Sequence, residues 1–175
     1  MEQKTTKVRI SYPIALNQAK RHLRIDNDFN EDDDYIQSVI KAATGYCENY
    51  IGRDISYTRN TLVLRDYTGS SLRLNEGGVI AVESATGPST TYTVSDTTIY
   101  EMWSLVEFSE SFTADPLTMT FTTGYNNDCP EDIQFAILAK VGDIYDMERN
   151  SYSYSAKRSN VIEMSLDSYK MIYFQ

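Results

Sequence analysis

The spacing of apolar side chains along the chain predicts three helices. Residues 14–25 place their apolar side chains on one helical face, and their basic residues elsewhere. Residues 32–51 carry an apolar side chain at every third or fourth position, and Gly52 follows directly as a C-terminal stop. A third stripe opens at Pro130, a residue suited to a first helical turn, and ends near residue 150. We expect a helix in each segment.

The period changes from helical to alternating between the second and third helices. Short alternating segments, bounded by turn residues, predict strands at 61–66, 71–75, 79–84, 91–95, 105–109 and 117–123. No helical pattern interrupts this series. The strands are therefore expected to pair in an antiparallel sheet.

These elements predict an α+β fold. We expect a small bundle of three main helices, an antiparallel β insertion between the second and last helices, and an extended C-terminal tail. The expected divisions are an N-terminal helical part of the core at 1–56, the β insertion at 57–127, the last core helix at 128–150, and a linker with a C-terminal docking tail at 151–175.

Charge is distributed unevenly. The 175 residues include 16 basic and 25 acidic ones, for a net charge of −9, which disfavours a protein that grips nucleic acid through its phosphates. Residues 74–139 contain ten acids and no Lys or Arg, whereas residues 1–24 contain six basic residues and one acid. The chain also has 14 tyrosines, a residue type enriched at protein–protein contacts.

The two cysteines, Cys47 and Cys129, lack CxxC spacing and are expected to be reduced thiols. The N-terminal residues contain no apolar run of the kind found in a secretory signal. No apolar stretch approaches the ~20 residues needed to span a bilayer. We expect a soluble, intracellular protein with no membrane partner.

Residues 26–34 resemble a calcium-binding loop only in part. Oxygen-bearing side chains alternate through the segment, but Glu31 stands where the template needs Gly, Asp33 where it needs an aliphatic residue, and Gln37 where it needs a bidentate Glu. A solvated helix-capping loop is the favoured interpretation, with no metal site. A metal-dependent hydrolase using this loop is the alternative from another class.

No catalytic constellation is present in the sequence. His22 lies among Lys20, Arg21 and Arg24 without a recognisable nucleophile motif, so a surface or interface role is favoured. A small DNA-binding module through these basic residues is a weaker alternative. Trp103 fits either a core position or an interface anchor. We expect no enzymatic activity and no cofactor.

Several segments in order along the chain resemble the head–tail connector (adaptor) proteins of tailed bacteriophages. The resemblance runs from about residue 14 to 150. Residues 16–26 resemble the family's opening helix, and residues 35–53 resemble its second helix with the Gly-Arg ending. Strand and turn segments at 72–75, 79–82 and 122–125 and the final helix at 130–149 are also similar. One departure is Ala15, which stands where many members have Ser or Thr.

This resemblance implies a virion component without enzymatic activity. Such proteins form a ring, usually twelve-fold, beneath the portal, and bridge it to the tail or a stopper. DNA passes through the central channel without sequence-specific binding. The implied location is the head–tail interface of the virion, and the host cytoplasm during assembly. Another head-completion or stopper protein, or a tail-completion protein, is the alternative.

A ring subunit needs two complementary flanks, and the charge pattern offers candidates for them. The candidate channel or interface acids are Asp28, Asp32, Asp33 and Asp34. The candidate subunit-interface residues are Lys20, Arg21, Arg24 and Trp103. The candidate residues for docking the tail on the portal or a neighbour are Val161, Ile162, Met164, Leu166, Tyr169, Tyr173 and Phe174.

Overall fold

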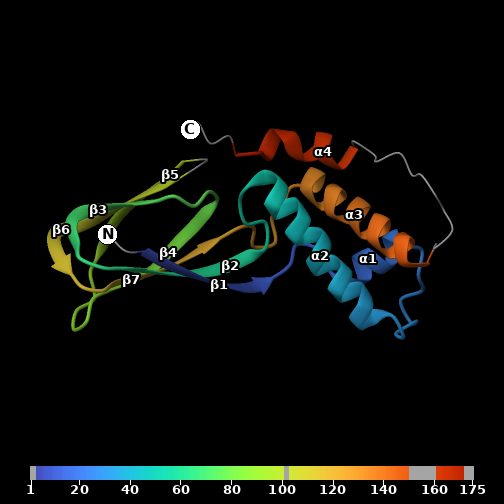
Figure 1. Cartoon of the computed structure of the whole chain (residues 1–175), viewed down its shortest axis with the longest axis horizontal. Helices are drawn as coiled ribbons and strands as arrows, with labels where there is room; N and C mark the ends of the chain where they lie inside the picture. Colours follow the sequence, from blue (N-terminus) through green and yellow to red (C-terminus); the bar gives the residue numbers. More distant parts are fainter. Residues whose placement is uncertain (1–2, 101–102, 150–160, 172–175) are drawn as a thin grey trace. The chain divides into compact units, whose positions relative to one another are not determined.

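The chain forms two compact units in a computed structural model that describes residues 3–100, 103–149 and 161–171 (Figure 1). The first, here called the β unit, comprises residues 1–11 and 56–126. The second, the helical unit, comprises residues 12–55 and 127–175. The chain therefore starts in the β unit, leaves it for two helices, returns, and leaves again.

The β unit consists of two antiparallel sheets. Its strands are β1 (Gln3–Ser11), β2 (Tyr57–Leu64), β3 (Tyr67–Leu74), β4 (Val79–Thr86), β5 (Val94–Ile99), β6 (Ser104–Ala114) and β7 (Leu117–Thr123). One sheet, sheet A, has the order β1-β2-β7-β4, and the other, sheet B, has the order β3-β6-β5. The antiparallel pairing predicted from the sequence is observed in both sheets.

Alternation of apolar and polar residues builds the core between the two sheets. In β2, Leu62 and Leu64 are buried while Arg59 is exposed, as expected for a strand with one covered face. Met119 and Phe121 of β7 lie in the same cluster as Val106 and Phe108 of β6 and as the other buried apolar residues of both sheets. The inner faces of both sheets thus share one hydrophobic core.

Strand β1 differs from the others because both of its faces are exposed. It pairs with β2 from Gln3 opposite Leu64 to Ser11 opposite Tyr57, and it forms the edge of sheet A. Only Thr5 is partly buried, and the other eight side chains of the strand are exposed. This strand consequently adds backbone hydrogen bonds to the β unit but almost no hydrophobic core.

The helical unit is built from four α-helices within the described residues. They are α1 (Leu16–His22), α2 (Asp33–Ile51), α3 (Glu131–Arg149) and α4 (Val161–Leu166), followed by a 3-10 turn, η1 (Asp167–Tyr169). Helix α2 packs along α3, and α4 lies against both of them (Figure 1). The buried apolar side chains of this unit are Ile36, Val39, Ile40, Ala43, Cys47 and Ile51 of α2, with Ile133, Ala136, Ile137 and Val141 of α3.

Helix α1 ends three residues earlier than the apolar pattern predicts. Arg24 adopts a left-handed backbone conformation with φ of 58°. The amide of Ile25 donates to the carbonyl of Lys20 at 2.9 Å, and the amide of Arg24 donates to that of Arg21 at 3.2 Å. These two bonds form a Schellman motif, which closes the last turn of α1 and directs the chain into the loop at 26–32.

The predicted arrangement of a small three-helix bundle with a β insertion is wrong, although the α+β class holds. In the described part of the chain, seven strands form two sheets, so the fold is rich in strands. Strand β1 precedes every helix and still pairs with β2, which an insertion between two helices would not do. The tail predicted as extended includes α4, because Ile162 and Leu166 are spaced four residues apart and bury the same helical face.

Two glycines, Gly45 inside α2 and Gly52 directly after it, give a test of this backbone. Gly52 ends the helix with φ of 79°, so Gly52→Ala should lower the free energy of unfolding by about 1 kcal/mol. Gly45 lies inside the helix with no atom within 4 Å of an added Cβ, so Gly45→Ala should raise it by about 0.5–1 kcal/mol. Urea unfolding followed by circular dichroism measures both changes. Effects of the same sign would contradict the assignment of the helix end.

Candidate functional site

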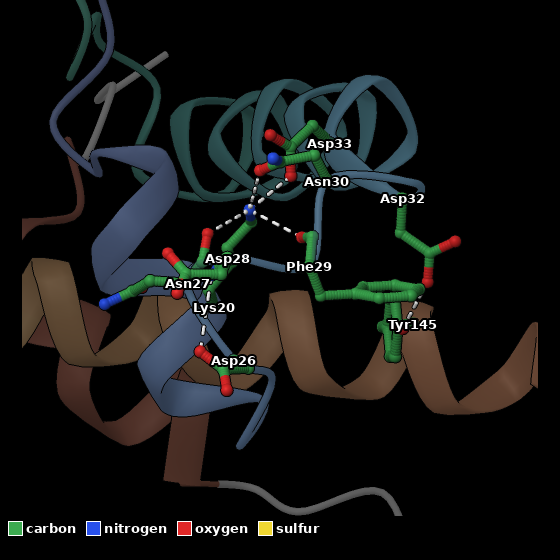
Figure 2. A network of polar contacts seen from close by, with 9 residues as sticks. All are labelled: Lys20, Asp26, Asn27, Asp28, Phe29, Asn30, Asp32, Asp33 and Tyr145. Atoms are coloured by element: carbon green, nitrogen blue, oxygen red, sulfur yellow. Dashed lines mark hydrogen bonds and ion pairs between the residues drawn. The ribbon is translucent and has the colours of Figure 1, made fainter.

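A buried lysine organises the acidic loop between α1 and α2. The side chain of Lys20 is only 1% exposed, and its ammonium lies inside the curve of the loop (Figure 2). It donates to the carbonyls of Asn27 at 3.2 Å and Phe29 at 2.8 Å, and to the Oδ1 of Asn30 at 3.3 Å. An ion pair of 2.5 Å joins it to Asp33 Oδ1. These partners offset the cost of burying the charge.

The loop also carries turns of its own. The amide of Phe29 donates to the carbonyl of Asp26, and the amide of Asp28 donates to the side chain of Asp26 at 3.3 Å. Asp and Asn favour such turns because their side chains accept bonds from nearby amides. The turns bring the carbonyls at 27 and 29 to the same side, where Lys20 binds them (Figure 2).

A second contact ties the end of the loop to α3. The hydroxyl of Tyr145 donates to Asp32 Oδ2 at 2.8 Å (Figure 2). The ring of Tyr145 also packs against that of Tyr35, with 5.8 Å between the ring centroids. Asp32 and Asp33 thus form contacts inside the helical unit, where they help to fix the start of α2.

The other two candidate acids present their side chains to solvent. Asp28, at the tip of the loop, and Asp34, in the first turn of α2, are both exposed. Asp34 also lies near the positive end of the α2 dipole, which favours a carboxylate there. The four acids proposed from the sequence therefore divide into an internal pair, Asp32 and Asp33, and an exposed pair, Asp28 and Asp34.

The loop resembles a cation site in geometry, but a protein cation fills its centre. The carbonyls and the carboxylate that surround the ammonium of Lys20 are oxygen ligands of the type that calcium uses. Across the described residues, no group of three or more His, Cys, Asp or Glu side chains is placed to hold a metal ion. Of the alternating oxygen side chains, only that of Asn30 binds Lys20, and the other contacts of the ammonium are two backbone carbonyls and the Asp33 carboxylate.

The remaining basic candidates, Arg21 in α1 and Arg24 after its end, lie at the surface. Arg21 and Arg24 are exposed, in contrast to Lys20. His22 is exposed as well, and its Nε2 lies 3.6 Å from the position of a Cβ added at Gly142 of α3. The four basic side chains of 20–24 therefore do not form one continuous patch.

Trp103 lies on the β unit in a stack of three side chains. Its ring stacks on that of Tyr100 at 4.1 Å between centroids, and the guanidinium of Arg73 lies 4.5 Å from its centroid. Arg73 is exposed, and the Trp103 side chain is partly buried. This stack fixes the orientation of Trp103 and leaves part of its surface open.

The structure places the candidate tail residues in different environments. Ile162 and Leu166 are buried in the helical unit, whereas Val161 is 46% and Met164 71% exposed. Tyr169 is partly buried, with the guanidinium of Arg53 at 5.9 Å from its ring centroid. Tyr173 and Phe174 lie outside the described residues.

Two hydrogen bonds join the segment after α4 to the end of α2. The hydroxyl of Tyr50 donates to Asp167 Oδ1 at 2.5 Å, and this hydrogen bond raises the pKa of Tyr50 to about 12. The amide of Met171 donates to the carbonyl of Ile51 at 2.8 Å. Residues 161–171 are thus a packed part of the helical unit.

Comparisons with known proteins agree with the resemblance seen in the sequence. The model of the phage gp6-like head-tail connector protein family matches residues 13–87. This match confirms the resemblance to head–tail connectors for that segment, which includes α1, the acidic loop, α2 and β2 to β4. No curated protein matches the sequence.

Solved structures share the fold over nearly the whole chain. A chain from the neck of an empty gene transfer agent particle, computed with C6 symmetry, has a TM-score of 0.77 at 14% identity and covers 100% of this chain and 98% of its own. A chain from the virion of the native particle has a TM-score of 0.74 at 13% identity, with 97% of both chains covered. A chain from the native neck, computed with C12 symmetry, has a TM-score of 0.70 at 14% identity and covers 98% and 97%.

Two features of the structure, the burial of Lys20 and strand β1, are not predicted from the sequence. A basic amphipathic segment is typical of a solvated face, and nothing in the spacing of 20–24 distinguishes Lys20 from Arg21. The two carbonyls that bind Lys20 belong to the backbone of the following loop, so their position depends on how the loop folds. Strand β1 was also missed, although Val8 and Ile10 alternate with Lys7 and Arg9.

Substitution of the buried lysine tests its structural role. Lys20→Met should lower the free energy of unfolding by about 2–3 kcal/mol, because it leaves loop carbonyls and the Asp33 carboxylate without their donor. Hydrogen exchange of the peptide 26–33 should accelerate. The exposed neighbour provides the control: Arg21→Met should change stability by less than about 0.5 kcal/mol.

The double variant Lys20→Met/Asp33→Leu separates the ion pair from the rest of the network. Removing the carboxylate along with the ammonium should recover part of the lost stability, since Asp33 then no longer leaves a carboxylate without its cation. Equal effects of Lys20→Met and Arg21→Met on unfolding and exchange would show that Lys20 does not organise the loop.

The two cysteines give a separate test of the helical core. Both are free and buried, and burial raises the pKa of Cys47 and that of Cys129 to about 12. At about pH 8 both thiols stay protonated and shielded, so iodoacetamide should label native protein far more slowly than urea-unfolded protein. Rapid labelling of the native protein, measured by mass spectrometry, would contradict this packing.

Proposed function

We propose that this chain is a structural subunit of the neck of a tailed phage-like particle. In this proposal, copies of the chain form a closed ring between the portal and the tail or stopper, with a central channel through which genome DNA passes. The observation that carries the proposal is the coincidence of two results: the connector family match at 13–87 and a whole-chain fold likeness to neck chains. The C6 and C12 symmetries of those neck structures support a ring.

The surface of the chain supports passage of DNA without binding. Asp28 and Asp34 expose their carboxylates, and the described residues of 74–139 add further exposed acids without a single Lys or Arg. A wall of this charge repels phosphates and does not form the contacts that would hold DNA in place. We propose that the exposed acids of the loop face the channel.

The contacts of Lys20 weigh against two competing functions, a metal-dependent hydrolase and a small DNA-binding module. The ammonium of Lys20 occupies the position that a hydrolytic metal would need in the loop. Burial of Lys20 also removes one of the three cations on which a DNA-binding module would depend. No described helix has both the length and the apolar character required to cross a membrane. The burial and the contacts of Lys20 favour the structural function over the hydrolase and the DNA-binding module.

Native mass spectrometry of the chain, with and without the portal protein of the same particle, tests the ring. The proposal predicts one closed oligomer of defined copy number, formed alone or on the portal. A chain that stays monomeric in both conditions would contradict it.

Charge reversal in the loop tests the channel. Asp28→Lys and Asp34→Lys should each allow ring assembly but slow DNA release from particles by about tenfold or more, because a ring multiplies every added cation around the DNA. Higher salt should restore the rate. The control is Asp143→Lys, which reverses an exposed acid of α3 outside the loop and should leave release unchanged. Normal release from both loop variants would remove the loop acids from the channel wall.

A further inference from the structure

Strand β1 is a nine-residue edge strand that no other described strand of the β unit covers. It pairs on one side with β2, and sheet A ends there within the described residues. Its side chains are exposed on both faces, with Val8 at 59% and Ile10 at 49%. An uncovered edge of this length presents a row of backbone donors and acceptors, which is a template for a further strand.

The exposed surface of β1 is basic and partly apolar. Lys4, Lys7 and Arg9 give the strand three positive charges, and Val8 and Ile10 add exposed apolar area next to them. The side chain of Lys7 reaches Glu76 at 3.1 Å but stays 41% exposed. Basic residues on an edge strand discourage pairing with another basic strand, and they favour an acidic one.

The opposite charge lies at the edge of sheet B. Strand β5 is the outer strand of that sheet, and its Asp96 stands directly opposite Glu107 of β6. Both carboxylates are exposed, and like charges opposite each other on a sheet are unfavourable. Ile99, at the end of β5, is 50% exposed. A basic strand alongside β5 would relieve this repulsion and cover the apolar side chain.

We propose that β1 of one copy of this chain adds to the β5 edge of a second copy, and extends its sheet B to β3-β6-β5-β1. The inference rests on the proposed ring, and it identifies the contact that closes it. Two different surfaces of the same chain meet, because β1 and β5 are each an outer strand of a sheet within the described residues. Backbone hydrogen bonds supply affinity, and the charges select the partner strand.

Helix α1 fits this role less well than β1. The Lys20 ammonium is buried and paired inside the helical unit, so Arg21 and Arg24 are the exposed Arg and Lys residues of the segment 20–24. The strongest complement to the acids of β5 and β6 is therefore the N-terminal strand. The other exposed basic residues are scattered over the two units.

Isotope-mixed cross-linking tests the contact directly. Equal amounts of nitrogen-14 and nitrogen-15 protein are mixed, assembled in the presence of the portal protein, and treated with a carbodiimide, which joins an amine to a carboxylate. We expect mixed-isotope peptide pairs that link Lys4 or Lys7 to Asp96 or Glu107. The Lys7–Glu76 pair, 3.1 Å apart within one chain, serves as the same-isotope reference.

The possible results separate this contact from the ring itself. Oligomers whose mixed-isotope links lie elsewhere would overturn the β1–β5 contact and leave the ring intact. Absence of any oligomer would overturn the contact together with the proposed ring. Mixed-isotope links between β1 and the β5–β6 pair would support both.

A charge exchange provides the second test. Lys4→Glu/Arg9→Glu should raise the concentration for half-maximal assembly by about tenfold, and adding Asp96→Lys/Glu107→Lys in the same chain should restore it. The matched control reverses two exposed cations of the helical unit, Arg21→Glu/Lys41→Glu, and should leave assembly unchanged. Thermal unfolding checks that each variant is folded. Failure of the exchange to rescue a folded variant would overturn the pairing.

Discussion

The buried ammonium of Lys20 is the constraint on which the organisation of the helical unit depends. This one residue binds the loop through both its backbone and its side chain. Its carbonyl accepts a hydrogen bond from the Ile25 amide at the end of α1, and its ammonium donates to the carbonyls of Asn27 and Phe29. Its ion pair with Asp33 places the first turn of α2. Burying a lysine is unfavourable without such partners, so the charge and the loop must be formed together. This coupling makes the segment between the helices a fixed structure.

Local signals were strong enough to predict most of the elements. The helix at 32–51 and the strand at 117–123 were placed nearly as observed, because α2 buries a continuous stripe and β7 has buried residues on its inner face. Gly52 was identified as the stop of α2 from its residue type, and its left-handed conformation agrees. These features depend on residues close in sequence.

Features that depend on distant residues could not be predicted in this way. The edge strand β1 alternates polar and apolar residues only at 7–10 and buries almost nothing, so its pairing with β2 is what defines it as a strand. The burial of Lys20 depends on a loop that begins after its helix, and the docking of Ile162 and Leu166 depends on α2 and α3. In each case the deciding contact is tertiary, and the residue type alone does not identify the partner.

The proposed function gives the net charge of −9 a structural meaning. The exposed acids at the tip of the loop and on the β unit are available to face DNA or a neighbouring copy, while Asp32 and Asp33 stabilise the helical unit itself. Electron cryo-microscopy of intact particles that contain this chain tests the neck assignment most directly. We predict a closed ring of this fold between the portal and the tail, with the acidic loop lining the channel. A reconstruction that places the chain elsewhere in the particle, or finds none of it there, would contradict the assignment.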